Sequence, residues 1–488
     1  MRKTTPGHRQ CLPDTVIKMP SRFKGNVEIF HRLKEIFGSN RVRNSSVETL
    51  LYAQDISPES LIARRAGRAA SGADFIVRPV AVEEISRLMR VASRWKIPIL
   101  PYGAGTSRRG SVAPLEGGIV CDMKRMNRIL SIDDESLIVS AQAGILGEHL
   151  EHELNRKGFT LGHFPWNFRA STLGGWVATR SAGEALTKYG GIADMVVSMQ
   201  AVLPDGSIVK TRTAPRSATG PDFNRLLTGS EGTLAIMTRV KLRIHVRSRS
   251  VAHLSFRFKK FSDGVLAARQ MLHRGLRPST IHLFDKSETA EFFADSKLRL
   301  SGNMLLITFE GHESRTEMES RIAEAICSDY GGDSRGEEPS QYRMEHRFSR
   351  AFRTSPAFSR KGVIIDTIEI GAPWSSIQNV YESLAKALSK RFEICAFLSR
   401  PTSQGAALTF TITAKATKES DIDLHKNLWD KAVKAVQSSG GAFIPTSGVG
   451  LRGAGLFAEQ MGAAHNWLKE VKVEIDPNRI LNPGKLGL

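Results

Sequence analysis

Cysteine is scarce in this sequence, and long apolar runs are missing. Four cysteines occur in 488 residues, namely Cys11, Cys121, Cys327 and Cys395. They are too scattered for a zinc knuckle, an iron–sulfur cluster or a disulfide framework, so we expect them to be reduced. No apolar run is long enough to span a membrane, and the N-terminus lacks the apolar core of a signal peptide. These absences predict a cytoplasmic protein.

Acidic residues are few relative to basic ones. The chain has 69 Lys and Arg residues against 49 Asp and Glu residues, which gives a formal net charge of +20. Such an excess attracts any polyanion non-specifically. The basic residues are spread along the chain without forming a known nucleic-acid module, which argues against direct binding of nucleic acid. Peripheral contact with an anionic membrane stays open.

The patterns that are present predict an α+β protein of several domains. With 488 residues, 41% of them hydrophobic, the chain is long enough for two or three buried cores. Apolar residues at helical spacing predict an amphipathic helix at 27–37. A strand at 75–77, a helix at 82–95 and a strand at 97–100 then form a strand–helix–strand unit. From residue 246 onward, strands alternate with helices, which predicts a separate domain with an antiparallel sheet.

The strand–helix–strand unit ends in a turn of small residues. The turn comprises Pro101, Tyr102, Gly103, Ala104, Gly105, Thr106 and Ser107. Because its two glycines have no Cβ atoms, backbone N–H groups can approach a phosphate closely, and two hydroxyls add further donors. A Gly-x-Gly turn by itself is more often a simple connection between two elements. The binding of an anion is therefore a hypothesis that needs support from other parts of the chain.

Three further stretches give that support. Residues 171–183 are rich in hydroxyls and glycine and are predicted to begin a helix, whose first N–H groups would face phosphate oxygens. A Gly-Ser-Glu-Gly-Thr-Leu stretch follows at 229–234, and a stretch at 476–485 that ends in Asn-Pro-Gly-Lys lies close to the end of the sequence. In this order and spacing, the four stretches resemble the flavin-binding oxidoreductases of the vanillyl-alcohol-oxidase type, which have a two-part, PCMH-type flavin domain.

Within that group, the sequence is most similar to the alkyldihydroxyacetonephosphate synthases. The likeness is carried by residues 101–107, 126–130, 162–163, 174–177, 217–222 and 229–234. It implies FAD as the cofactor and an α+β fold in which an α+β cap domain with an antiparallel sheet covers the flavin domain. The implied division is a basic N-terminal segment with its amphipathic helix at 1–45, an FAD-binding domain at 46–245, a cap domain for the substrate at 246–440 and a C-terminal segment at 441–488 that returns to the flavin domain.

The resemblance also assigns residues around the cofactor. Residues 101–107 would hold the pyrophosphate, residues 166–172 and 179–182 would line the isoalloxazine ring and ribityl chain, and 231–237 would approach the adenosine half. The predicted cofactor-binding residues are Pro101, Tyr102, Gly103, Ala104, Gly105, Thr106, Ser107, Trp166, Asn167, Ser171, Thr172, Gly174, Gly175, Thr179, Arg180, Ser181, Ala182, Glu231, Gly232, Thr233, Leu234, Ile236, Asn482 and Lys485. We expect non-covalent FAD, because the turn lacks the histidine to which related flavoproteins attach the ring.

The catalytic side departs from the synthases. Their run of histidines before a Gly-Val-Gly element is replaced by Pro-Thr-Ser at 445–447, and their active-site tyrosine by Thr-Ala-Lys at 413–415. Threonine, serine and alanine cannot transfer protons at neutral pH. Arg400 matches a retained arginine, and His282 stands where the synthases have another arginine. We predict that Arg400 binds a carboxylate or phosphate and that His282 accepts a proton, the alternative for His282 being a buried structural histidine.

The sequence thus predicts an FAD-dependent oxidase or dehydrogenase that moves a hydride from a small anionic alcohol, a 2-hydroxy acid, to flavin. The electron acceptor is unknown, and a homodimer is left open. A metal site is not expected, because residues 402–406 lack the ligands of the metal-dependent hydroxy acid branch. Two alternatives stay open: a synthase-like transferase acting on a lipid-like ether precursor, and a catalytically silent flavoprotein that serves as a basic binding module.

Overall fold

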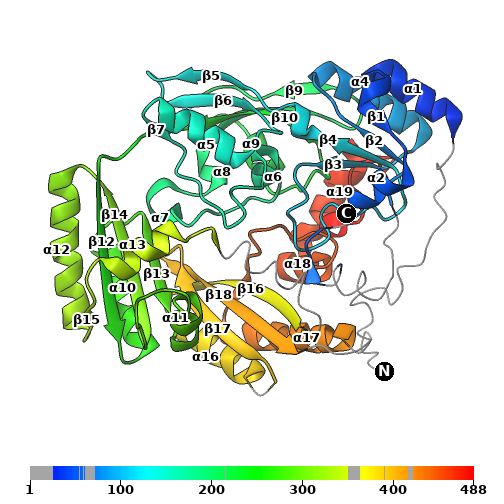
Figure 1. Cartoon of the computed structure of the whole chain (residues 1–488). Coiled ribbons are helices and arrows are strands. Elements are labelled where there is room, and N and C mark those ends of the chain that lie inside the picture. The colour runs from blue at the N-terminus through cyan, green and yellow to red at the C-terminus, as the bar shows by residue number, and fades with distance from the viewer. Residues whose placement is uncertain are drawn as a thin grey trace.

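The chain folds into two units that are stacked in Figure 1. The computed structural model describes residues 26–488 except 54, 59, 61–71, 215, 350–362, 390 and 416–420. Residues 1–25 of the predicted basic segment, with Cys11, lie outside the described residues. The upper unit in Figure 1, here the N-terminal unit, contains two principal sheets, whereas the lower one, the cap unit, is built on a single large sheet.

The first sheet of the N-terminal unit carries the glycine-rich turn. Its strand order is β1(Val42–Arg43), β2(Phe75–Val77), β4(Ile119–Asp122) and β3(Ile99–Tyr102), with β2, β4 and β3 parallel. Around it lie α1(Val27–Phe37), η1(Ser39–Arg41), α2(Ser46–Leu51), α4(Val82–Trp95) and η2(Met123–Arg125). Helix α4 buries Ile85, Leu88 and Met89 completely, as the helical spacing of its apolar residues requires. Strand β3 delivers the turn at one edge of this sheet.

The second sheet is antiparallel and lies next to the other two glycine-rich segments. Its order is β5(Ile129–Asp133), β6(Ile138–Gln142), β10(Ile236–Arg243), β8(Val196–Val202) and β9(Ile208–Lys210). Around it lie α5(Gly147–Arg156), α6(Leu173–Ala178), α7(Leu186–Tyr189), α8(Ile192–Met195), α9(Phe223–Leu227) and the strand pair β7(Phe159–Thr160) with β11(His245–Val246). The third segment, at 229–234, therefore leads directly into the central strand β10.

The cap unit is an eight-stranded antiparallel sheet. Its order is β15(Asp333–Ser334), β12(Ser250–Phe258), β14(Asn303–Gly311), β13(Thr280–Phe284), β17(Glu393–Ser399), β18(Gly405–Lys415), β16(Val363–Pro373) and β19(Ala442–Phe443). Helices α10(Phe261–His273), α12(Glu313–Asp329), α16(Ile377–Leu388) and α17(Asp421–Ser439) cover one face, and α11(Lys286–Phe292) and α13(Glu338–Glu345) lie near the other.

Alternation along the central cap strands gives the sheet two different faces. Ile281, Leu398, Leu408 and Ile368 belong to the buried core beneath the four covering helices. Successive side chains of a strand point to opposite faces. On each of these strands, the residues directly before and after the core residue therefore point to the other face of the sheet. This face is turned away from the four covering helices and lies on the side of the N-terminal unit.

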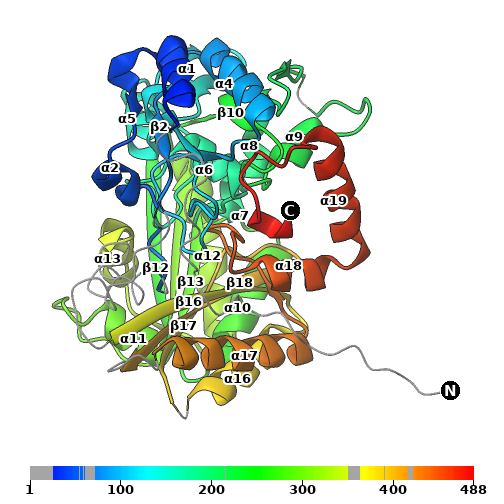
Figure 2. The same ribbon diagram turned by 90° about the vertical axis from the view of Figure 1, so that its right-hand side faces the viewer.

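The C-terminal segment runs from the cap sheet back to the N-terminal unit, as Figure 2 shows for α18(Ala454–Met461) and α19(Ala463–Ile475). Beyond α19, Leu481 pairs with Ile99 in a parallel bridge at the edge of the first sheet, and η3(Lys485–Gly487) closes the chain. The buried ammonium of Lys472 contacts Asp476 and donates hydrogen bonds to the carbonyls of Thr233 at 2.7 Å and Leu481 at 2.9 Å. The hydrogen bond from Lys472 to Thr233 joins α19 to the third glycine-rich segment.

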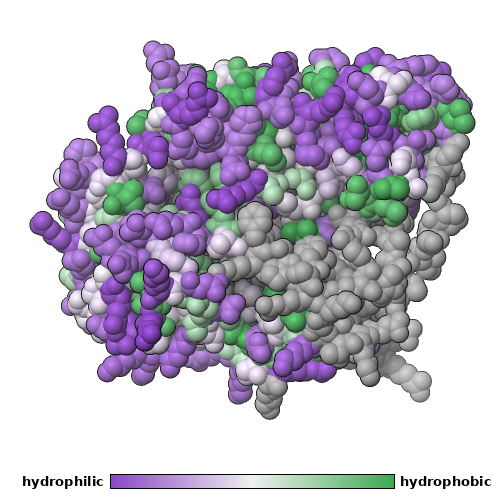
Figure 3. Space-filling view, in the orientation of Figure 1, coloured by the Kyte–Doolittle hydropathy of each residue, from purple (hydrophilic) through white to green (hydrophobic). Residues whose placement is uncertain are grey.

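No helix among the described residues combines the length and the apolar composition needed to cross a membrane. The face drawn in Figure 3 is mostly hydrophilic where side chains are coloured, and its apolar residues lie in separate small groups.

Candidate active site

The glycine-rich turn is shaped by close contacts at both glycines. A Cβ atom on Gly103 would collide with Oγ1 of Thr172, and one on Gly105 would collide with the hydroxyl of Tyr102. Gly105 also has a φ of 69°, in the region that favours glycine. Lys124 donates a hydrogen bond from Nζ to the carbonyl of Gly103 at 3.1 Å. The turn thus has a defined shape in which Thr172 and Tyr102 pack directly on the two glycines.

The second segment contacts the turn through its polar side chains. Asn167 donates a hydrogen bond from Nδ2 to Oγ1 of Thr106 at 2.9 Å. Thr172, which excludes a side chain at Gly103, is also the N-cap of α6 and accepts a hydrogen bond from the N–H of Gly175 at 3.3 Å. The start of α6 and the turn are therefore held against one another.

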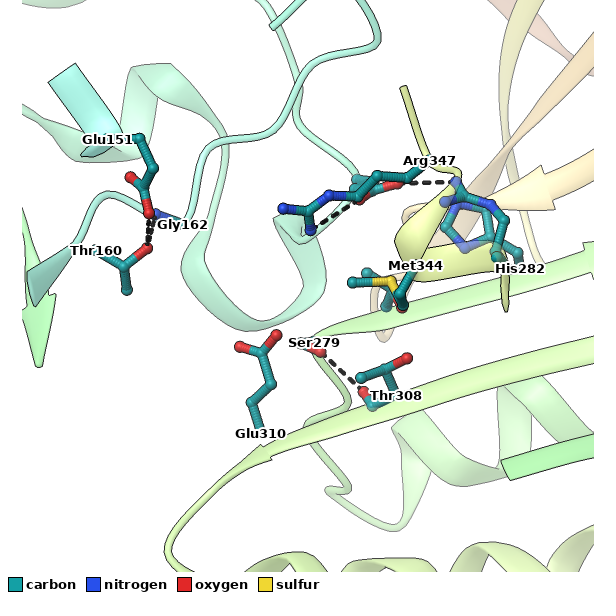
Figure 4. A network of polar contacts seen from close by, with 12 residues as sticks. Glu151, Thr160, Gly162, Ser279, His282, Thr308, Glu310, Met344 and Arg347 are labelled. Carbon is teal, nitrogen blue, oxygen red and sulfur yellow. Dashed lines mark hydrogen bonds and ion pairs between the residues drawn. The ribbon is translucent and has the colours of Figure 1, made fainter. Parts of the chain in front are cut away.

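His163 and Glu151 are buried and form hydrogen bonds with residues in and before the second segment. Nε2 of His163 lies 2.8 Å from Oγ of Ser181, and burial lowers the pKa of His163 to about 3. Glu151 accepts a hydrogen bond from Thr160, whose Oγ1 in turn accepts one from the N–H of Gly162 at 3.0 Å, as Figure 4 shows. His163 is therefore neutral and serves as a polar bridge.

Glu231 connects the third segment to the C-terminal segment. Its carboxylate accepts hydrogen bonds from the N–H groups of Val449 and Gly450, the latter at 2.9 Å, and burial raises its pKa. Its backbone has a φ of 49°, a strained value for a residue with a side chain. Asn482 donates from Nδ2 to the carbonyls of Glu231 at 2.7 Å and Ser111 at 3.1 Å. This network locks the segment in place.

Together the three segments line one cavity of about 900 Å³. The predicted residues that line it are Pro101, Tyr102, Gly103, Ala104, Gly105, Thr106, Ser107, Asn167, Ser171, Thr172, Gly174, Gly175, Thr179, Ser181, Glu231, Gly232 and Ile236. The lining offers hydroxyls and backbone groups, and it contains no lysine, arginine or histidine side chain among the described residues. We call it the first cavity.

Seven predicted cofactor residues do not line the first cavity. Arg180 is exposed, whereas Thr233, Leu234, Asn482 and Lys485 are buried in the surrounding loops. Lys485 donates a hydrogen bond to the carbonyl of Ala113 at 2.7 Å, and burial lowers its pKa to about 7. Asn482 and Lys485 therefore support the cavity wall from behind. The remaining two, Trp166 and Ala182, line a neighbouring cavity.

This second cavity, of about 1040 Å³, lies between the cap sheet and the N-terminal unit. Its lining consists of Arg108, Phe164, Trp166, Ala182, Glu184, His282, Phe284, Glu288, Phe292, Arg343, Arg347, Phe348, Thr367, Glu369, Phe397, Ser399, Arg400, Thr409, Thr411, Thr446 and Ser447. Thr446 and Ser447 line the first cavity as well. The two cavities therefore meet at these residues, and both predicted catalytic residues lie in the second.

His282 lies in the second cavity but is engaged by a neighbouring arginine. Arg343 donates from Nη2 to Nε2 of His282 at 3.0 Å and to Glu184 at 2.8 Å, and Arg347 also contacts Glu184 at 3.3 Å. Figure 4 draws His282 and Arg347 in this network. Because guanidinium only donates, Nε2 of His282 is the acceptor and is unprotonated. Burial and the charge of Arg343 hold the pKa of His282 well below its usual range. This arrangement does not favour its predicted role as a proton acceptor.

Arg400 directly follows β17 and lies beside the acidic residue Glu369. Its Nη2 is 3.5 Å from Oε1 of Glu369, which is too long for a hydrogen bond, and this buried nitrogen has no hydrogen-bond partner. Its φ of 50° is strained for a residue with a side chain. Glu369 accepts hydrogen bonds from the backbone N of Thr446 at 2.6 Å and from its hydroxyl at 2.9 Å. Arg400 and Glu369 therefore lie next to the junction of the cavities.

Two arginines follow the glycine-rich turn and reach the cap sheet. Arg108 donates to Oγ1 of Thr367 at 2.9 Å, its buried Nε has no hydrogen-bond partner, and burial lowers its pKa. Arg109 donates to the carbonyl of Thr367 at 3.1 Å and lies 4.0 Å from the ring centre of Trp429. Burial by itself would raise the pKa of Asp366, but the charge of Arg109 helps to hold this pKa below its usual range. Arg108 thus belongs to the second cavity.

A cavity with a glycine-rich rim that meets a second cavity with charged groups is the arrangement by which an oxidoreductase places a dinucleotide beside its substrate. Residues 73–212 match the model of the FAD binding domain, and residues 247–486 match that of the C-terminal domain of FAD linked oxidases. The chain belongs to this family of FAD-dependent oxidoreductases. The predicted cofactor, enzyme class and two-part α+β fold are thereby confirmed.

Two curated relatives and a solved structure illustrate the similarity. The alkyldihydroxyacetonephosphate synthase of Dictyostelium discoideum is 28% identical over 94% of this chain and 80% of its own length. The mitochondrial D-lactate dehydrogenase (cytochrome) of Arabidopsis thaliana is 27% identical over 85% of this chain and 73% of its own length. A solved alkyldihydroxyacetonephosphate synthase has a TM-score of 0.81 at 26% identity, covering 94% of this chain and 86% of that chain.

The first cavity fits FAD by its own features. Gly103 and Gly174 occupy positions where a Cβ atom would collide with or crowd Thr172 and Ala143, which leaves backbone exposed to the cavity. Hydroxyls of Thr106 and Ser107 supply further donors for a diphosphate. Within the described ranges, no group of three or more His, Cys, Asp and Glu side chains is arranged to hold a metal ion.

Several residues of the site were not predicted as such. They include Glu184, Arg343, Glu369, Thr446 and Ser447. Thr367 and Glu369 alternate with Ile368 and Ile370 along β16, so the period of two places them on the face opposite the core. This alternation could therefore have identified Glu369 as a residue on the face of β16 opposite the core. Nothing local in the sequence marks the pairing of Arg343 with Glu184, which lie 159 residues apart.

Proposed function

We propose that this FAD-dependent enzyme oxidises a small anionic alcohol, and specifically a 2-hydroxy acid. The observation that carries the proposal is a pair of arginines in the second cavity, Arg400 and Arg108. Each has a buried nitrogen without a hydrogen-bond partner among the described residues, and, unlike Arg343, neither is hydrogen-bonded to a carboxylate of the described chain. Buried donors without partners are costly, and a substrate carboxylate would satisfy them. The similarity to a D-lactate dehydrogenase supports the same class of substrate.

Both arginines are tied to one strand of the cap sheet. Arg108 donates to Thr367, and Arg400 lies beside Glu369, two positions further along the same face of β16. Two residues of a strand span roughly 7 Å. A carboxylate between the two guanidinium groups would be held close to the junction of the cavities, where Thr446 and Ser447 face both sides.

Glu369 is the group we assign to accept the hydroxyl proton. It is hydrogen-bonded to Thr446 at the junction, whereas His282 is on strand β13, three strands away in the order β13-β17-β18-β16. At the usual spacing of neighbouring strands, the two positions are separated by roughly 14 Å. In addition, Arg343 occupies Nε2 of His282. An ionised carboxylate is an acceptor without any rearrangement.

When bound, FAD would supply the hydride acceptor. The carboxylate of Glu369 would take the proton of the substrate hydroxyl, so that the 2-hydroxy acid would become a 2-keto acid. Residues 101–107 would hold the diphosphate through backbone and hydroxyl donors. Arg343 and Arg347 are both hydrogen-bonded to the carboxylate of Glu184, and we assign them a structural role in this part of the cavity.

Anaerobic reduction of the bound flavin tests this proposal. Addition of 2-hydroxy acids to the FAD-loaded protein should bleach the oxidised flavin absorbance, and a panel that leaves the spectrum unchanged would contradict it. The similarity to alkyldihydroxyacetonephosphate synthases favours a second candidate, a transferase. Formation of an ether product from acyl-dihydroxyacetone phosphate and a fatty alcohol would support that candidate instead.

A further inference from the structure

The second cavity has an aromatic part as well as a charged one. Besides Arg400 and Glu369, its lining includes Phe284, Phe292 and Phe397 from the cap unit. Phe164 and Trp166 from the N-terminal unit and Phe348 from the segment after α13 line it as well. This aromatic lining is larger than a two- or three-carbon hydroxy acid needs for contact.

Three phenylalanines form the wall on the side of the cap sheet. Phe284 and Phe397 are directly opposite each other on the neighbouring strands β13 and β17, with ring centres 5.8 Å apart. Phe292, from α11, packs edge-on against Phe284 at 5.3 Å. Opposite residues on neighbouring strands point to the same face, so this wall is built into the register of the sheet.

The other three rings of the lining, Phe164, Trp166 and Phe348, are held by cation–π and ring contacts. Arg347 lies 4.1 Å from the ring centre of Phe164 and 4.8 Å from that of Phe348. Phe348 stacks on Phe168 at 5.1 Å, and Arg108 lies 5.2 Å from the ring of Trp166. These rings are fixed from behind and are not free to collapse into the cavity.

The arginines of this cavity differ in how they are paired. Near Phe292, Arg343 and Arg347 both pair with Glu184, at 2.8 and 3.3 Å, and Arg343 also donates to His282. At the junction, Nη2 of Arg400 has a 3.5 Å contact with Glu369 but, among the described residues, no hydrogen-bond partner, and Nε of Arg108 has none either. A nitrogen of Arg343 is unmatched as well, but this guanidinium is already hydrogen-bonded to a carboxylate. We therefore place the carboxylate of the substrate between Arg400 and Arg108.

We infer that the substrate is a 2-hydroxy acid whose carbon-2 substituent is an arylalkyl or compact branched alkyl group, which the phenylalanines receive while Arg400 and Arg108 hold the carboxylate. This inference rests on the proposed function. It names the part of the substrate that distinguishes this enzyme from one acting on a two- or three-carbon hydroxy acid.

A panel of compounds tests the inference on the FAD-loaded protein. Under anaerobic conditions, 3-phenyllactate and 2-hydroxy-4-methylpentanoate should reduce the flavin at lower concentrations than lactate or glycolate do. Equal or better reduction by lactate or glycolate would overturn the inference and leave the proposed oxidation intact. Stronger perturbation of the flavin spectrum by a long-chain fatty acid than by 3-phenylpropionate would overturn it as well.

Binding without oxidation separates the two proposals. 3-Phenylpropionate lacks the hydroxyl, so it should perturb the spectrum of bound flavin while acetate does not. If this binding is seen but no hydroxy acid reduces the flavin, the proposed oxidation fails and the selectivity of the cavity stands. If neither binding nor reduction by aryl compounds is observed, the inference is wrong.

Two Phe→Leu variants test whether the phenylalanine wall causes the preference for 3-phenyllactate over lactate. Phe397→Leu should reduce the preference for 3-phenyllactate over lactate, because it removes a ring from the wall. Phe223→Leu makes the same chemical change in α9, outside both cavities, and should leave the preference unchanged. Both variants must retain FAD to be compared, and an unchanged preference in flavin-loaded Phe397→Leu would overturn the assignment of this wall.

Discussion

Glu369 and Thr446 join the cap unit to the C-terminal segment at the junction of the two cavities. Thr446 donates to the carboxylate from its backbone N at 2.6 Å and from its hydroxyl at 2.9 Å. Thr446 is one of two residues that line both cavities, the other being Ser447. The pairing therefore places a carboxylate where substrate and cofactor would meet.

Replacement of Glu369 by glutamine should slow the reduction of flavin while leaving substrate binding largely intact. The amide can still accept hydrogen bonds from Thr446, but it cannot take a proton from the substrate. Loss of a general base slows a reaction by about 10²- to 10⁴-fold. Stopped-flow measurement of the anaerobic reduction rate at saturating substrate checks this, and a rate like that of wild type would assign the proton to another acceptor.

Replacement of Arg400 by alanine should weaken the binding of the substrate. Removal of a charge-assisted hydrogen bond costs about 1.5–3 kcal/mol, which corresponds to a KM roughly 10- to 100-fold higher. Arg321→Ala, at an exposed position of α12 on the covered face of the cap sheet, is the matched control and should behave as wild type. Equal KM values for the two variants would remove Arg400 from the substrate site.

Replacement of Gly103 by alanine should reduce the retention of FAD. The added Cβ would collide with Oγ1 of Thr172, so either the turn or the start of α6 must move. Gly455→Ala is the control, because a Cβ there meets no atom within 4 Å. The flavin content of the purified variants, measured by absorbance after gel filtration, distinguishes them. Full FAD content in Gly103→Ala would contradict the role assigned to the turn.

Lys485 should make the stability of the protein depend on pH in a predictable direction. Burial lowers its pKa to about 7, whereas in the unfolded chain lysine holds its proton up to about pH 10.4. Between these values the unfolded chain binds more protons than the folded one, so this residue makes stability rise with pH.

The variant Lys485→Met lacks this dependence. The free energy of unfolding of wild type minus that of the variant should therefore increase between about pH 7 and pH 9. Denaturant titrations of both proteins at several pH values measure it. A difference that stays constant would show that the buried amine does not titrate in this window.

Some features of the fold follow from local sequence. The helical spacing of Ile85, Leu88 and Met89 predicts α4, and Gly103 with Gly105 predicts a turn with exposed backbone. These predictions succeed because periodicity and glycine geometry act over a few residues. The placement of Asn482 and Lys485 behind the cavity wall could not be predicted in this way, because their partners are far along the chain, as for Lys485 and Ala113.

The sequence by itself determined the flavin-binding class, since the order and spacing of its glycine-rich segments carry that information in the chain. Only the tertiary structure decided the chemistry of the second cavity. Arg343 engages His282 and Thr446 engages Glu369 across separations of 61 and 77 residues. Hydrogen bonding and burial at these contacts are set by which strands become neighbours, and they determine which group is available to accept a proton.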